Sequence, residues 1–74
     1  MFQNYLPGDI VTLVYSDCGL IHGTTQYTWV PRCKIGVVVG GEEHSRHSKS
    51  EEIEILVLID GNLLWIESSS LEKR

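Results

Sequence analysis

The chain has 74 residues, so we expect one small domain over residues 1–74, without separate cofactor and substrate domains. Its 42% hydrophobic and 22% charged residues exclude the compositions of disordered chains, collagens and coiled coils. Six Lys and Arg against ten Asp and Glu give a formal net charge of -4, the opposite of the balance typical of proteins that bind duplex nucleic acid.

The first predicted strand covers residues 9–15, which are rich in β-branched and aromatic side chains and follow the turn pair Pro7-Gly8. Residues 16–25 include two glycines, and they predict either a long loop or the tip of a twisted hairpin.

Two further strands are predicted in the middle of the chain. Residues 26–30 alternate polar and aromatic side chains as a half-buried strand does, and Pro31 ends this strand or confines it to a sheet edge. Residues 33–40 are the third candidate strand, and the polar residues 41–52 predict an exposed loop after it.

A hairpin is predicted near the C-terminus. Asp60-Gly61 lies between the apolar strands Ile53–Ile59 and 62–66, and Asp-Gly is a strong signal for a tight type I′ turn. Three serines in residues 68–71 favour a single 3-10 turn over a longer helix.

About five short strands without a crossover helix predict an all-β fold, either an antiparallel barrel or a small sandwich. Barrel closure is favoured because it removes exposed strand edges. A one-residue slip would exchange the buried and exposed faces of a strand, so the assignment of the core depends on register. The expected core consists of apolar side chains on these strands: Ile10, Val14, Ile35, Val37, Val39, Ile55, Val57, Ile59, Leu64 and Ile66.

A series of short motifs resembles a known family of folds. Gly-Asp-Ile-Val at residues 8–11 precedes the irregular segment, and Gly-Val-Val-Val at residues 36–39 precedes the polar loop. The Asp60-Gly61 turn, a Trp-bearing strand at 63–66 and Ser-Ser-Ser-Leu at 68–71 follow. This order resembles the SH3-like small β-barrel, and most closely the short barrel proteins encoded by tailed bacteriophages.

The resemblance covers about residues 6–73. It implies an SH3-like barrel that is a non-catalytic protein-binding or structural module, acting in a phage assembly or on a host factor. The family has no shared catalytic residues. It often carries an aromatic residue just before the hairpin turn, where this chain has Leu58-Ile59, so an aromatic groove at that place is not carried over.

Aromatic residues near the first long loop are the candidate partner contacts. Tyr15, Tyr27 and Trp29 flank this loop, and amphipathic rings suit protein recognition. We add Glu42 and Glu43 of the charged loop to the candidate partner-binding residues. The structural alternative is that these rings pack on the barrel and that the carboxylates only solvate the loop; Trp65, inside an apolar strand, is expected in the core.

Continuous apolar runs also favour self-association. Residues 37–39 and 55–59 do not alternate, although a strand in a small barrel has one face in solvent. Cover for the second face would come from another copy or a protein partner, and the alternative explanation is simple strand propensity.

Metal and thiol chemistry receive little support. Cys18, His22, Cys33, His44 and His47 are possible ligands, but no CxxC knuckle is present, so free thiols and solvated imidazoles are the simpler interpretation. A small barrel offers little pocket volume, and we therefore expect no enzymatic activity and no cofactor.

Nucleic-acid binding is the alternative function, with Arg32, Lys34, Arg46 and Lys49 as phosphate contacts.

Residues 1–5 lack the features of a signal peptide, and no apolar run is long enough to span a bilayer. The expected location is the cytoplasm, that of the host if the protein is viral, or the virion.

Overall fold

The computed structural model describes residues 5–44 and 53–74, with residues 41–44 by their backbone alone. The elements follow in the order β1 (Ile10–Leu13), β2 (Asp17–Ile21), β3 (Tyr27–Val30), β4 (Ile35–His44), β5 (Ile53–Ile59), β6 (Asn62–Glu67), the 3-10 turn η1 (Ser68–Ser70) and β7 (Leu71–Lys73). The all-β prediction and the 3-10 turn are confirmed. In this described part of the chain, no helix has the length and apolar character needed to cross a membrane.

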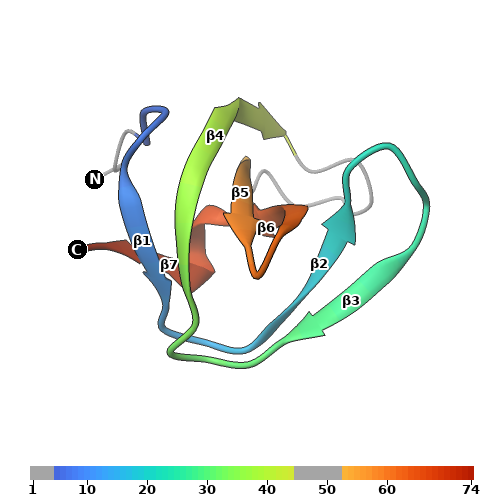
Figure 1. The fold of residues 1–74 in the computed structure, drawn as a ribbon, viewed down its shortest axis with the longest axis horizontal. Coiled ribbons are helices and arrows are strands. Elements are labelled where there is room, and N and C mark those ends of the chain that lie inside the picture. The colour runs from blue at the N-terminus through green and yellow to red at the C-terminus, as the bar shows by residue number, and fades with distance from the viewer. Residues whose placement is uncertain (1–4, 45–52) are drawn as a thin grey trace.

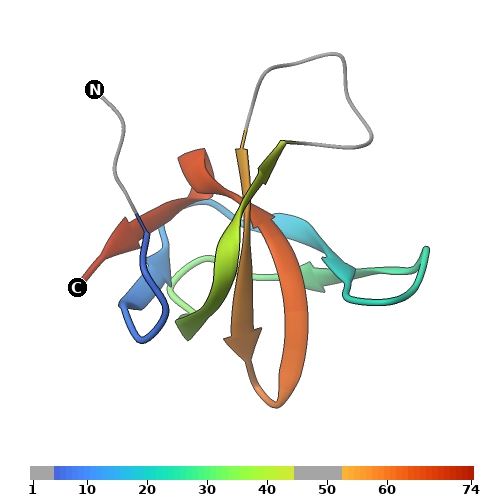
Figure 2. The same cartoon turned by 90° about the horizontal axis from the view of Figure 1, so that it is seen from above.

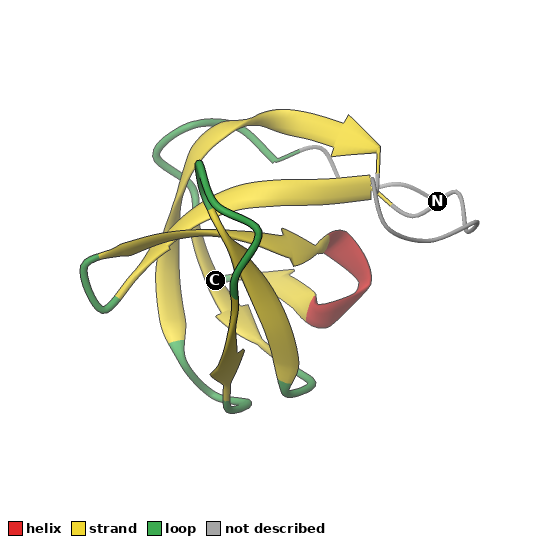
Figure 3. Cartoon of the chain, turned by 90° about the vertical axis from the view of Figure 1, so that its right-hand side faces the viewer, coloured by secondary structure: helices red, strands yellow, loops and turns green. Residues whose placement is uncertain are grey.

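The strands named above belong to one antiparallel sheet in the order β3-β2-β6-β5-β4-β1-β7. The sheet curls around one interior, with η1 at one end (Figures 2 and 3). The β2–β3 hairpin lies on the opposite side of the molecule from β1 and the C-terminus (Figure 1). Within residues 5–44 and 53–74, the sheet has seven strands and ends at β3 and β7, so neither the predicted count of about five nor closure of the barrel is observed there.

The two additional strands arise from pairing rather than from local composition. β2 contains Asp17 and Gly19, which are poor strand formers, yet it pairs with β3 on one side and β6 on the other. β7 pairs with β1 immediately after η1. Such long-range pairing overrides the local preferences from which the sequence prediction was made.

The β5–β6 hairpin is confirmed at the predicted residues. Ile59 is paired with Asn62, and the two residues between them have positive φ angles of 50° at Asp60 and 81° at Gly61. Positive φ at both central positions defines the type I′ turn, whose twist matches that of the flanking strands.

The predicted loop over residues 41–52 is partly wrong. β4 continues through residues 41–44 and pairs with β5, with an irregular register between Val38 and Glu42. Backbone pairing outweighs the polar composition of this segment. Residues 45–52 lie outside the described part of the chain.

The buried apolar core confirms half of the predicted residues. Ile55, Val57, Ile59, Leu64 and Ile66 are buried, as expected for β5 and β6. The prediction was wrong on β1, just after it and on β4, where the following predicted core residues are exposed or, for Val14, half-buried: Ile10, Val14, Ile35, Val37 and Val39.

Gly36 explains the phase of β4. A Cβ atom at this position would lie 2.5 Å from Val57 Cγ1 and 2.9 Å from the carbonyl oxygen of Leu58. Only glycine fits there, so Gly36 and Val38 face the core, and the residues between and beside them face outward. Ile10 is paired with Val37 and therefore faces outward with it.

Candidate functional site

The outer face of the sheet, opposite the core, carries a group of exposed aliphatic side chains. Ile10, Val37 and Leu58 are successive cross-strand partners on β1, β4 and β5. Ile35 and Val39 lie on the same side of β4, next to Val37 along the strand. These five residues, named the aliphatic patch, are each between 38% and 51% exposed. Contiguous exposed apolar side chains are typical of interaction surfaces, whereas single ones are normal on any protein.

The aliphatic patch follows directly from the continuous apolar runs in the sequence. In β4 and β5, alternate residues such as Val38 and Val57 fill the core, while Val37 and Leu58 point to the other side. Within the described part of the chain, Val37 and Leu58 are exposed to solvent. From the continuous apolar runs we expected the second face of these strands to need cover by another molecule. The exposed side chains on that face form a surface that a partner could cover.

A second exposed apolar area lies on β3. Trp29 and Tyr27 are paired with Cys18 and Leu20 of β2 and project to the outer face. Trp29 is 64% exposed and Tyr27 is 49% exposed. We name these two residues the aromatic edge, because β3 is the last strand of the sheet.

Buried apolar residues connect the aromatic edge with the rest of the outer face. Tyr27, Leu20, Trp65 and Leu56 are successive cross-strand partners on β3, β2, β6 and β5. Leu20 and Leu56 are buried, although neither belongs to the core cluster on the inner side. Trp65 was predicted in the core; it is instead half-buried on the outer face, with its ring centroid 6.0 Å from that of His22.

The other predicted partner contacts are not gathered with the aromatic edge. Tyr15 lies exposed in the connection between β1 and β2. Glu42 and Glu43 lie in β4, opposite Ile55 and Glu54, and three strands of the sheet separate β4 from β3. The side chains of Glu42 and Glu43 lie outside the described part.

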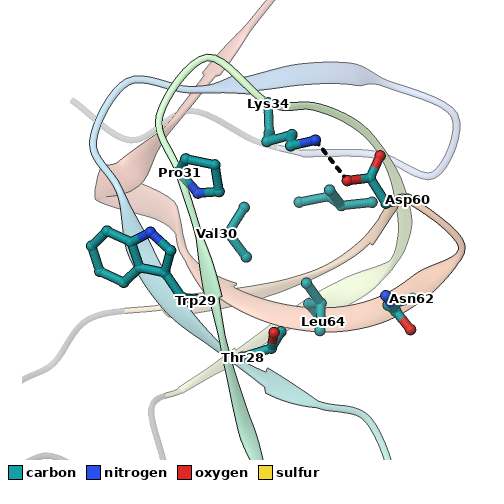
Figure 4. Close-up of a pocket in the computed structure, with 9 residues that line it drawn as sticks. Thr28, Trp29, Val30, Pro31, Lys34, Asp60, Asn62 and Leu64 are labelled. Carbon is teal, nitrogen blue, oxygen red and sulfur yellow. Dashed lines mark ion pairs between the residues drawn. The ribbon is translucent and has the colours of Figure 1, made fainter.

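A small pocket lies between β3 and the β5–β6 turn. Its volume is about 150 Å³, and the buried side chains of Val30 and Leu64 point into it (Figure 4). Lys34 Nζ forms an ion pair of 2.8 Å with the Asp60 carboxylate at its rim. Ligand sites usually measure about 300–1,000 Å³, so this space suits a single side chain rather than a cofactor. Sequence reasoning missed it because only the fold brings residues 28–34 and 59–64 together.

The basic residues predicted as phosphate contacts are not clustered in the part of the chain that the structure describes. Arg32 is exposed in the β3–β4 connection, and the charge of Lys34 is partly compensated by Asp60. Arg46 and Lys49 lie outside the described residues. The described chain thus supplies one uncompensated cation of this set for the alternative nucleic-acid function.

The cysteines and histidines are dispersed in the described chain. Cys18 and Cys33 are exposed free thiols, on β2 and in the β3–β4 connection. Among the described residues, no three His, Cys, Asp or Glu side chains are grouped so as to hold a metal ion. The side chain of His44 and the whole of His47 are outside that part of the chain.

Among the described residues, the two groups with shifted pKa values, Tyr5 and Asp9, lie at the β1–β7 end of the sheet. Burial and then the charge of Glu72 raise the pKa of Tyr5, whose hydroxyl donates a 3.1 Å hydrogen bond to the Leu71 carbonyl. The backbone N–H of Leu6 donates a 2.9 Å hydrogen bond to Asp9 and lowers the pKa of this carboxyl, with a smaller contribution from Lys73 at 3.4 Å. The Tyr5–Leu71 hydrogen bond and the Asp9–Lys73 ion pair both connect the segment before β1 with β7.

Comparison of the chain with protein families, curated proteins and solved structures finds no match. Its function is therefore inferred from the aliphatic patch and the aromatic edge.

Proposed function

We propose that this chain is an SH3-like barrel that serves as a non-catalytic protein-binding module and docks through its outer face. The order of the elements supports the SH3-like assignment. A first strand is followed by a long excursion containing the β2–β3 hairpin, and then by the adjacent strands β4, β5 and β6. η1 precedes a last strand that returns to pair with β1. The sequence resemblance to phage-encoded barrels suggests an assembly or a host factor as the setting.

The aliphatic patch is the observation that carries the proposal. Its members are neighbours across three strands and include no charged side chain. Each Å² of apolar surface removed from water stabilises a complex by about 25 cal/mol before the costs of association, so covering this patch is favourable. A solitary folded chain gains nothing from keeping five such side chains in water.

The aromatic edge supports the same function. Trp and Tyr are enriched among residues that dominate binding energy, because they combine a large apolar surface with a polar group. Trp29 is the more exposed of the pair. We expect Trp29→Ala to weaken binding of a protein partner by about 2 kcal/mol or more if Trp29 is a central contact.

A charge-substitution experiment tests the proposal. Tagged wild-type protein and the variants Val37→Lys, Leu58→Lys and Ser69→Lys are used to isolate partners from the source cell. The Kd of each variant for the purified partner is then measured. Ser69 is exposed in η1, outside the sheet, so Ser69→Lys adds the same charge away from the outer face. Circular dichroism of each variant checks that the fold is intact.

We expect the partner to bind wild type and Ser69→Lys equally and to bind the two patch variants at least about tenfold more weakly, which corresponds to about 1.4 kcal/mol. Full affinity of folded Val37→Lys and Leu58→Lys would contradict the proposal. Steeply salt-dependent binding to DNA or RNA, without a protein partner, would favour the nucleic-acid alternative.

A further inference from the structure

The two edge strands of the sheet differ in how they are protected against pairing. β7 has three residues, and its exposed Glu72 and Lys73 are of the charged kind that discourages strand addition. β3 has the sequence Tyr-Thr-Trp-Val, with no charge, no proline and a continuous register to β2. Figure 1 shows β3 as the outermost strand on its side of the molecule. β3 therefore lacks the charged side chains, internal proline and bulge that usually protect an edge strand.

The backbone N–H and C=O groups of Trp29 point away from β2, toward the open edge of the sheet. The Ile21 N–H donates a 2.9 Å hydrogen bond to the Gln26 carbonyl, so this opposed pair is a hydrogen-bonded one. In an antiparallel ladder such pairs alternate, and the N–H and C=O of Trp29, three residues along, are directed to the other side. Cys18 lies opposite Trp29. Its N–H donates a 2.8 Å hydrogen bond to the Asp17 carboxylate and not to Trp29, as expected for a pair that is not hydrogen-bonded.

We propose that β3 pairs antiparallel with β3 of a second copy of this chain, through the backbone of Trp29. A two-fold axis at this residue would make the two Trp29 residues exchange both of their outward hydrogen bonds, as opposed residues of an antiparallel pair do. Their rings would be cross-strand neighbours on the outer face, an arrangement that favours pairing.

A second copy fits this edge better than a charged peptide does. The chain has a net charge of -4, but its β3 carries no charged side chain, so two identical strands meet without like charges opposite each other. Pro31 follows β3 and lacks an N–H, which limits the pairing to this short strand. Since β7 is protected, the described strands leave one pairing-competent edge in each chain, which gives a closed dimer rather than a filament.

Solution mass and hydrogen exchange test the proposal directly. The mass of the wild-type protein is measured over a wide concentration range, and exchange of the Trp29 amide is followed by NMR over the same range. We expect a concentration-dependent dimer in which exchange at Trp29 slows as the dimer forms. Exchange at Gly23, in the β2–β3 turn, serves as the internal control and should not change.

Three variants separate this edge from the aliphatic patch. Trp29→Ala keeps the backbone N–H and should dimerise more weakly, whereas Trp29→Pro removes the donor and should be monomeric. Val37→Lys lies on β4 and should dimerise like wild type. If Trp29→Pro fails to fold, exchange at Trp29 in the wild-type protein still decides.

A protein that stays monomeric at every concentration would overturn the inference. So would a dimer in which exchange at Trp29 is independent of concentration and which Val37→Lys dissociates. That second outcome would place self-association on the aliphatic patch, and would therefore leave the proposed function intact while removing β3 from the interface.

Discussion

Replacement of Gly36 by alanine tests the packing that determines which face of β4 is buried. The added Cβ would lie 2.5 Å from Val57 Cγ1, 2.6 Å from Ile59 Cγ1 and 2.9 Å from the Leu58 carbonyl oxygen, whereas ordinary contacts are 3.4–4 Å. Two of these atoms belong to buried side chains and the third to the backbone of the paired strand. A rotamer change cannot relieve the contact with the backbone, so β4 and β5 would have to separate.

The expected loss of stability follows from these contacts. Overpacking a core by a methyl group costs about 1–3 kcal/mol, and reduced freedom of the unfolded chain returns roughly 0.4–1 kcal/mol for a Gly→Ala change. With one contact to backbone, we expect a net loss of about 2 kcal/mol for Gly36→Ala. In a domain of this size, that loss lowers Tm by roughly 8–16 °C.

Thermal and urea denaturation of Gly36→Ala measure this loss, with Gly40→Ala on the same strand as the matched control. A Cβ at Gly40 would lie 3.2 Å from Leu56 and would meet only side-chain atoms within 4 Å, so we expect a loss below about 1 kcal/mol. If Gly36→Ala is as stable as Gly40→Ala or wild type, the explanation for the phase of β4 is refuted.

Three further changes test local features of the fold. Cys33 has a φ of 74°, so Cys33→Gly should raise the free energy of unfolding by about 0.5–1 kcal/mol in urea denaturation; a lower value would show that this backbone is not strained. Tyr5→Phe removes the hydrogen bond to Leu71 and should cost about 1 kcal/mol in the same assay, while unchanged stability would mean that the bond contributes nothing net. The pKa of Asp9 is lowered in the fold, so its contribution is present above the ordinary carboxyl pKa of about 3.9 and is lost as pH falls through the lower folded value. Asp9→Asn should therefore flatten the decline of stability below about pH 4; an unchanged slope would contradict this.

Local turn chemistry accounts for the parts of the fold that could be predicted. Asp60-Gly61 determined the β5–β6 hairpin because few residue pairs accept positive φ at both central positions. Pro31 correctly indicated that the strand before it ends there and lies at a sheet edge. Alternation placed Tyr27 and Trp29 on one side of this strand but left open whether that side packs on the barrel; the structure shows both side chains exposed.

The aliphatic patch could not be predicted because local alternation is missing from β4. Val37, Val38 and Val39 are chemically alike, so the sequence alone does not say which of them faces the core. The decision depends on the contacts of Gly36 with β5, which lies about twenty residues further along the chain. As a result, four of the five patch residues were expected in the core: Ile10, Ile35, Val37 and Val39.

The central claim is that the aliphatic patch is covered by a protein partner. Methyl NMR of the labelled protein, recorded with and without its purified partner, tests it most directly. We expect the methyl signals of Ile10, Val37 and Leu58 to shift or broaden on binding, while the core methyls of Ile55 remain nearly unchanged. Saturating partner that leaves all three patch signals unperturbed would contradict the claim.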